Sequence, residues 1–103
     1  MRLMIRFSIP TETSNDLVAS GRIGEIFGKL MEDLHPEAVY AYPEGGERGG
    51  ILIVNGEQGQ DVAKLIEPLW LALGASVELI PVMTGEDLMG VLPALQETAR
   101  RYS

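Results

Sequence analysis

The 103-residue chain contains no cysteine, one histidine, and eight basic residues against fifteen acidic ones. The absence of cysteine excludes disulfide bonds, thiol nucleophiles and zinc sites built on thiolates. The net charge of −7 disfavours binding to nucleic acid, because phosphate contacts need a concentrated basic surface and the basic residues here are scattered. The one basic cluster, Arg100 and Arg101, fits the C-terminal end of a helix better than it fits a phosphate site.

Long apolar runs are also missing. Arg6 interrupts the apolar start of the chain, so no signal-peptide core is expected, and no run approaches the length of a membrane-spanning helix. We therefore expect a cytoplasmic protein without membrane association. A hydrophobic content of 46% is ordinary for a folded globular protein, and the length suits a single domain over residues 1–103.

Four stretches rich in apolar or alternating residues predict β-strands. They cover residues 2–9, 38–42, 51–54 and 76–83. The glycine-rich segment 43–50 lies between the second and the third stretch and predicts a hairpin with a flexible tip. Because these glycines precede a strand and not a helix, they do not predict a phosphate-binding loop.

Apolar residues at helical spacing predict three helices. They cover residues 22–34, 58–73 and 85–101, with Pro68 interrupting the second helix and Pro93 the third. Gly74 stands where a C-cap glycine is expected. The polar segment 11–20 is expected to be a loop or a loose helical turn.

The elements follow the order strand, helix, strand, strand, helix, strand, and one more helix. With right-handed crossovers, this order predicts an α+β protein with the ferredoxin-like βαββαβ fold and an extra C-terminal helix. Its antiparallel four-stranded sheet has the strand order 4-1-3-2 and carries two helices on one face. A register centred on the first and fourth strands places Arg6 opposite Glu78, on the face away from the helices.

The face of the predicted sheet that lies away from the two helices is more apolar than a solvent-exposed face usually is. Met4 lies on it with aliphatic residues of the third and fourth strands and with one side of the second strand, which offers Tyr40 and Tyr42 together; Arg6 and Glu78 are its charged members. An apolar patch of this extent is seldom left in water. We expect a second copy to cover it, which gives a homodimer through the sheet faces; the alternative is that the final helix covers part of it.

Three short motifs accompany this pattern. They are residues 34–38 (Leu-His-Pro-Glu-Ala), 67–70 (Glu-Pro-Leu-Trp) and 81–88 (Pro-Val-Met-Thr-Gly-Glu-Asp-Leu). In these motifs and in its element order, nearly the whole chain resembles the dimeric α+β barrel superfamily, which includes muconolactone isomerase-like proteins, and within it a subgroup of short bacterial proteins. The resemblance implies a homodimer with a site for a small organic molecule and no cofactor. It brings no catalytic motif to transfer.

Arg6 and Glu78 are the leading candidates for chemistry. Arg6 would anchor an anion and Glu78 would act as an acid or base, in a pocket beside Tyr40 or Tyr42, with Met4 as a further ligand contact. The alternative is a structural ion pair that sets the strand register or the dimer geometry.

Two further side chains are candidates for the site. His35 is the only histidine and therefore a candidate general base, although its place at a helix C-terminus favours a capping role. A lone histidine predicts no metal site. Trp70 lies beside the leucine stripe of the second helix, where packing is expected and stacking against a ligand is the alternative.

Residues 84–87 (Thr-Gly-Glu-Asp) form an acidic corner that capping explains. Thr84 suits an N-cap, and Glu86 and Asp87 complement the positive end of a helix, so a catalytic carboxylate is disfavoured there. The resemblance implies a small-molecule-binding protein or a cofactor-free enzyme of the isomerase or monooxygenase kind, with its site between the sheet and the helices or inside the barrel of the dimer. The alternative is a non-catalytic dimeric module with an interaction or regulatory role.

Overall fold

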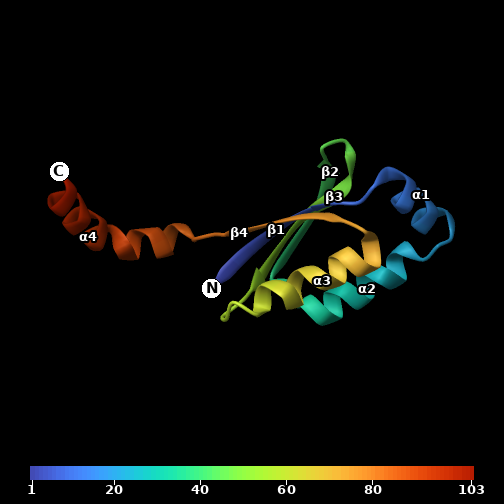
Figure 1. The fold of residues 1–103 in the computed structure, drawn as a ribbon, viewed down its shortest axis with the longest axis horizontal. Coiled ribbons are helices and arrows are strands. Elements are labelled where there is room, and N and C mark those ends of the chain that lie inside the picture. Colours follow the sequence, from blue (N-terminus) through green and yellow to red (C-terminus); the bar gives the residue numbers. More distant parts are fainter.

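The computed structural model describes all 103 residues and contains one sheet with four helices (Figure 1). In chain order the elements are β1 (Arg2–Ser8), α1 (Thr11–Ala19), α2 (Ile23–Leu34), β2 (Ala38–Glu44), β3 (Glu47–Asn55), α3 (Asp61–Leu73), β4 (Ser76–Pro81) and α4 (Gly85–Tyr102). All neighbouring strands are antiparallel, in the order β2-β3-β1-β4. The predicted ferredoxin-like fold, its extra C-terminal helix and its strand order are confirmed.

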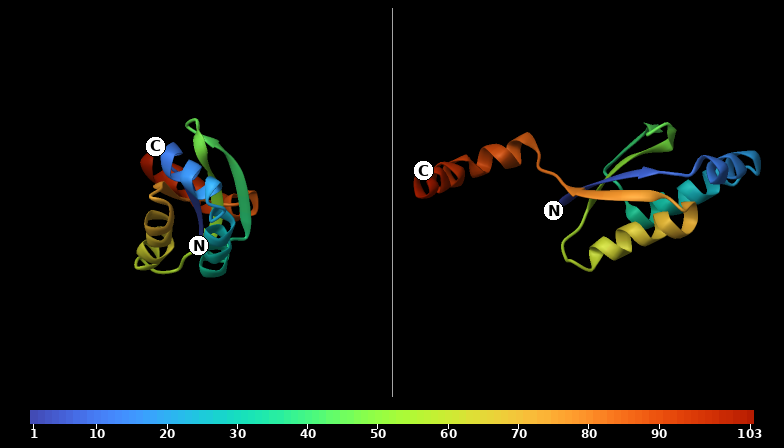
Figure 2. Two further views of the ribbon diagram at one scale, coloured as in Figure 1. Left: turned by 90° about the vertical axis from the view of Figure 1, so that its right-hand side faces the viewer. Right: turned by 45° about the horizontal axis from the view of Figure 1, so that its top comes forward.

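The core lies between one face of the sheet and helices α2 and α3 (Figure 2). Alternate residues of β1 point into it because successive side chains of a strand face opposite sides. Ile5, Leu52 and Leu69 are fully buried there. Thirteen buried apolar residues form the cluster: Leu3, Ile5, Phe7, Ile9, Leu17, Leu30, Leu34, Leu52, Val54, Leu65, Leu69, Leu73 and Ala75.

Residues 11–19 form the regular helix α1, where the sequence predicted a loop or a loose turn. The helix begins after Pro10, whose carbonyl oxygen accepts from the amide of Ser14 at 2.9 Å. Only Ser14 and Leu17 are buried in it. A helix that turns so little apolar surface to the core leaves almost no periodic signal in the sequence, and this explains the difference.

The β2–β3 hairpin is longer and more regular than the flexible eight-residue tip that the sequence predicted. Only Gly45 and Gly46 form the turn, with φ of 61° and 86°, values that glycine adopts without penalty. Gly49 and Gly50 lie inside β3. A Cβ atom would stand 2.1 Å from the carbonyl oxygen of Phe7 at Gly49, and 2.1 Å from that of Tyr40 at Gly50. The strands therefore approach each other there in a way that only glycine allows.

The two prolines within helices do not divide them. Helix α3 runs through Pro68 as one element and ends at Gly74 in the left-handed conformation, as predicted for a C-cap glycine. Helix α4 likewise continues through Pro93. No helix combines the length and the apolar character that crossing a membrane requires.

Helix α4 stands apart from the rest of the molecule (Figure 2). None of its residues is buried, and it extends from one end of the sheet to give a shape of 59 × 26 × 20 Å. The final helix therefore does not cover the second face of the sheet in its own chain, the alternative that the sequence left open. This face, which we call the open face, carries no helix.

Candidate functional site

Arg6 and Glu78 lie opposite each other on β1 and β4, as the sequence predicted. Ile51 of β3 and Tyr40 of β2 continue the same row across the open face. The Arg6 Nη1 atom lies 3.8 Å from Glu78 Oε2, and the Glu78 side chain is 67% exposed. The two charges therefore form a loose pair in contact with solvent, and a pair of this kind contributes little to stability.

The closest partner of Arg6 is Glu44, which the sequence analysis missed. Arg6 Nη2 donates to Glu44 Oε1 at 2.7 Å, and the hydroxyl of Tyr42 donates to Glu44 Oε2. The sequence pattern predicts Glu44 in the hairpin turn. The alternation of Tyr40, Tyr42 and Glu44 along one strand was the signal that could have placed it on the open face.

The protonation of this network follows from its hydrogen bonds. Donation from Arg6, and then from Tyr42, lowers the pKa of Glu44. The hydrogen bond that Tyr42 donates to Glu44 raises the pKa of the Tyr42 hydroxyl. The hydrogen bond that Arg6 donates to Glu44 raises the pKa of the Arg6 guanidinium. Glu44 is therefore ionised and Tyr42 neutral at pH 7. The charge of Arg6 is already shared between two carboxylates, which weakens it as an anchor for a foreign anion.

The rest of the open face is an apolar strip. Met4 lies between Ile53 of β3 and Ile80 of β4 in the next row, and all three are half-buried. Ile51 and Val82 extend the strip and are also half-buried. The predicted apolar second face is therefore present, with Met4 at its centre.

His35 and Trp70 lie apart from Arg6 and Glu78. His35 ends α2 in the left-handed conformation, with its backbone N–H donating to the carbonyl of Met31 at 3.1 Å, so its predicted place at a helix C-terminus is confirmed. Its surroundings are a polar hollow that Arg2, Glu37 and Asp87 also line and that neither Arg6 nor Glu78 reaches. Trp70 is 52% exposed on α3 and lines neither this hollow nor the large cavity described below. The candidate residues are thus not gathered into one site.

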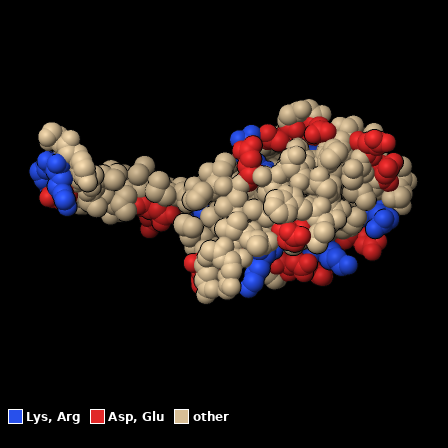
Figure 3. All heavy atoms as spheres, in the orientation of Figure 1, with Lys and Arg blue, Asp and Glu red and all other residues tan.

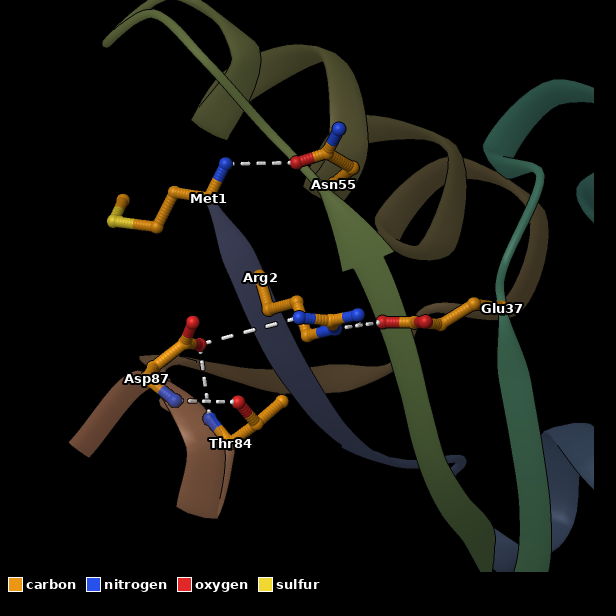
Figure 4. A network of polar contacts seen from close by, with 6 residues as sticks. All are labelled: Met1, Arg2, Glu37, Asn55, Thr84 and Asp87. Atoms are coloured by element: carbon orange, nitrogen blue, oxygen red, sulfur yellow. Dashed lines mark hydrogen bonds and ion pairs between the residues drawn. The ribbon is translucent and has the colours of Figure 1, made fainter. Parts of the chain in front are cut away.

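Thr84 and Asp87 form the capping box at the start of α4 (Figure 4). The Asp87 amide donates to Thr84 Oγ1 at 2.9 Å, and the Thr84 amide donates to Asp87 Oδ2 at 3.0 Å. The latter bond lowers the pKa of the Asp87 carboxyl. Arg2 lies between two carboxylates: its Nε atom is 2.6 Å from Glu37 Oε1, and its Nη1 atom is 4.0 Å from Asp87 Oδ2. The predicted capping role of this acidic corner is confirmed.

The largest cavity lies where the β2–β3 hairpin meets α1 and α2, and has a volume of about 720 Å³. Phe7 and Ile9 lie at its base, and Phe27 packs against Phe7 with ring centroids 6.2 Å apart. Ile23 and Val39 add apolar side walls. The full lining is Phe7, Ile9, Thr11, Asn15, Ile23, Phe27, Val39, Tyr40, Ala41, Tyr42, Pro43, Gly46, Glu47, Arg48 and Gly49.

One end of this cavity is polar because the hairpin is bonded to α1 there. Glu47 Oε2 accepts from the backbone N–H of Thr11 at 3.0 Å. Arg48 Nη1 donates to Ser14 Oγ at 2.9 Å and to Asn15 Oδ1 at 2.7 Å. None of the five ion pairs in the structure includes Arg48. Its guanidinium is thus positioned by neutral groups and keeps an unneutralised charge at the edge of an apolar cavity.

Comparison with known proteins adds no assignment: no protein-family model matches the chain, and no curated protein matches it. The structure also has no group of three or more His, Asp or Glu side chains placed to hold a metal ion. Two features of the structure bear on function: the cavity beside Arg48, and the open face with its Arg6–Glu44–Tyr42 network.

Proposed function

We propose that the protein binds a small amphipathic molecule, with an apolar body and one anionic group, in the cavity between the β2–β3 hairpin and helices α1 and α2. The observation that carries this proposal is an apolar cavity of about 720 Å³ with the unpaired guanidinium of Arg48 at its edge. Sites for small molecules typically measure about 300–1,000 Å³ and combine apolar walls with a few oriented polar groups.

The choice of an anionic ligand follows from how Arg48 is held. Ser14 and Asn15 both accept from its Nη1 atom, so the remaining N–H groups of the guanidinium are free to donate. A guanidinium donates readily to a carboxylate in a bidentate arrangement, and its bonds to neutral groups do not cancel its charge. Glu47 also lines the cavity, but its Oε2 accepts from the amide of Thr11 and it forms no ion pair with Arg48.

The resemblance to the dimeric α+β barrel superfamily supports small-molecule binding, and a site between the sheet and the helices is one of the two locations expected from the sequence. Tyr40 and Tyr42 belong to β2 and are among the lining residues of the cavity, whereas Arg6 and Glu78 are not. Turnover by an isomerase- or monooxygenase-like reaction at Arg6 and Glu78 stays a prediction. Binding of the ligand in the cavity requires no such turnover.

Octanoate and 1-octanol are suitable probes because they share an alkyl chain and differ in charge. In amide-resolved NMR titrations we expect octanoate to shift the signals of Phe7, Ile23 and Phe27, and 1-octanol to bind more weakly. Arg48→Met should weaken octanoate binding about tenfold or more and leave 1-octanol nearly unchanged, because one charge-assisted contact is lost. Arg22→Met, which removes an exposed arginine elsewhere, is the matched control.

A second variant tests the location of the site independently of charge. Ala41→Trp places a large side chain on the cavity wall and should reduce the binding of both probes, whereas Leu71→Trp on the exposed side of α3 should not. Octanoate shifts that map to the open face, or shifts that survive Ala41→Trp unchanged, would contradict the proposed cavity.

The alternative function, a dimeric interaction module without a ligand, is favoured by a different observation. The open face is apolar and no element of its own chain covers it, and α4 is exposed along its whole length. Under this second proposal the protein forms a homodimer that buries both surfaces. Sedimentation velocity over a range of concentrations tests it, and a monomer at every concentration would exclude it.

A further inference from the structure

Helix α4 has an apolar stripe along one side. No other part of its own chain buries this stripe. Leu88, Val91, Leu92 and Leu95 recur at spacings of three and four residues, which places them on one side of the helix. They remain 37–48% exposed. Between the acidic residues at its base and the arginines at its tip, the shaft of α4 shows an uncharged surface (Figure 3). An amphipathic helix of this length has little stability of its own in water.

The open face of the sheet presents a second apolar surface that needs a cover. Met4, Ile53 and Ile80 form one row across three strands, and Ile51 and Val82 extend the strip on either side. An antiparallel sheet normally leaves a polar face to water, so an aliphatic strip of this kind indicates a packing partner.

The residues that connect α4 to β4 direct the helix away from its own sheet. The amide of Val82 donates to the carbonyl of Arg2 at 3.1 Å, which continues the strand pairing past β4. The Thr84–Asp87 capping box then fixes the first turn, and the Arg2 side chain lies 4.0 Å from Asp87. Helix α4 therefore leaves the end of the sheet along the direction of the strands (Figures 1 and 4). Folding back onto the open face would require this connection to be rebuilt.

From these observations we infer that α4 of one copy docks on the open face of a second copy, and that the second copy returns its own α4 to the first. Every chain carries one apolar helix and one apolar face, so a two-fold exchange uses both surfaces and leaves neither unpaired. This arrangement replaces direct contact between two sheets with helix-on-sheet packing. It does not rest on the ligand cavity, whose apolar lining belongs to the helix-covered side of the sheet.

The size of the contact suits a stable dimer. An 18-residue helix is about 27 Å long and about 10 Å across, so one side of it offers about 400 Å². The receiving sheet buries a similar area, and two-fold symmetry doubles the sum to about 1,600 Å², the size of a standard specific interface.

The C-terminal tip of α4 is also opposite in charge to the net acidic body of a second copy. Its tip carries Arg100 and Arg101, and only Arg100 is paired, with Glu97 of the same helix. Residues 1–84 hold twelve acidic and six basic residues, and Glu78 on the open face is 67% exposed with Arg6 as its only ion-pair partner. The basic tip of α4 and the acidic body of a second copy are therefore attractive in sign.

Sedimentation velocity of the full chain provides the first test. We expect a concentration-dependent dimer whose dissociation constant rises about 100-fold or more in Leu92→Glu, because each dimer would have to bury two unpaired carboxylates. Leu71→Glu, at a 79% exposed leucine on α3, is the matched control and should leave the dimer unchanged. A wild-type monomer at all concentrations, or a dimer that tolerates Leu92→Glu, would overturn the exchange.

The second test locates α4 without weakening the contact. Because the chain has no cysteine, Gln96→Cys gives a single site for a spin label near the end of α4. A spin-labelled, isotopically unlabelled chain mixed with a ¹⁵N-labelled wild-type chain should broaden the amide signals of Met4, Ile53 and Ile80. A label at Leu71→Cys should broaden none of them. Broadening only when the label and ¹⁵N are in the same chain would show a folded-back helix, and no broadening at all would equally exclude the exchange.

Discussion

The body of the protein, residues 2–81, and helix α4 show the same kind of apolar periodicity and yet have opposite environments. Leu65, Leu69 and Leu73 of α3 are buried, whereas Leu88, Leu92 and Leu95 of α4 are all more than a third exposed. The spacing of apolar residues shows that a helix has a side to bury, but it does not say which chain supplies the partner surface. In the body the partner is the helix-covered face of the sheet; for α4 we infer a second copy.

The largest expected difference between the two regions is in the free energy of unfolding after one leucine in each is replaced by alanine. Leu69→Ala removes a fully buried side chain from the core and should lower the free energy of unfolding by about 2–5 kcal/mol, because a cavity remains. Leu92→Ala should change it by less than about 0.5 kcal/mol at protein concentrations where the monomer dominates. Urea unfolding of both variants at low protein concentration measures the two changes in the free energy of unfolding. Equal decreases in Leu69→Ala and Leu92→Ala would contradict the separation of α4 from the body.

A second, smaller effect is expected where two strands of the body approach each other most closely. A Cβ atom at residue 50 would stand 2.1 Å from the Tyr40 carbonyl oxygen, so Gly50→Ala must displace β2 or β3. We expect a loss of about 1–3 kcal/mol, the usual range for a strained backbone position, together with shifted amide signals along β2. Gly59→Ala is the control, because its added methyl group meets nothing within 4 Å. It shows how far a glycine-to-alanine change alters stability when no clash occurs.

The parts of the fold that could be predicted are those where one residue type decides the structure locally. The alternation of Leu3, Ile5 and Phe7 predicted β1 and its buried side, and centring β1 on β4 predicted the Arg6–Glu78 register. Gly74 and Thr84 predicted helix ends because their conformational and hydrogen-bonding roles depend on the nearest neighbours only.

The cavity could be predicted only in part, because two of its walls come from elements that the sequence pattern did not reveal. Helix α1 buries only two residues, and the glycines of β3 were interpreted as a flexible turn, so neither wall was expected. The position of Arg48 beside Ser14 and Asn15 joins residues more than thirty positions apart. Glu44 was missed for the same reason, since its role depends on the continuation of β2 beyond Tyr42.

A smaller effect is expected at the junction of the two regions, where Thr84 caps α4. Thr84→Ala removes the bond that the Asp87 amide donates, and should destabilise the first turn of α4 by about 1 kcal/mol. Hydrogen exchange at the amides of Asp87 and Leu88 should accelerate about fivefold, while the unfolding temperature of the body changes little. Thr84→Ser keeps the hydroxyl and should restore slow exchange; if it does not, the cap is not the cause.

The smallest expected effect is the pH dependence of the Arg6–Glu44–Tyr42 network on the open face. Because its hydrogen bonds lower the pKa of Glu44 below the ordinary value of 4.5, the folded state binds that proton less readily than the unfolded chain. The stabilisation is therefore complete above pH 4.5 and is lost as the pH falls through the lowered pKa of the folded state.

Glu44→Gln removes this titration, so the difference in unfolding free energy between wild type and variant should shrink as the pH is lowered. Added salt should reduce it at any pH, because the groups are in contact with solvent. Glu67→Gln on α3, which breaks no ion pair, is the control, and a carboxyl NMR titration of Glu44 with its midpoint at the ordinary value would contradict the network.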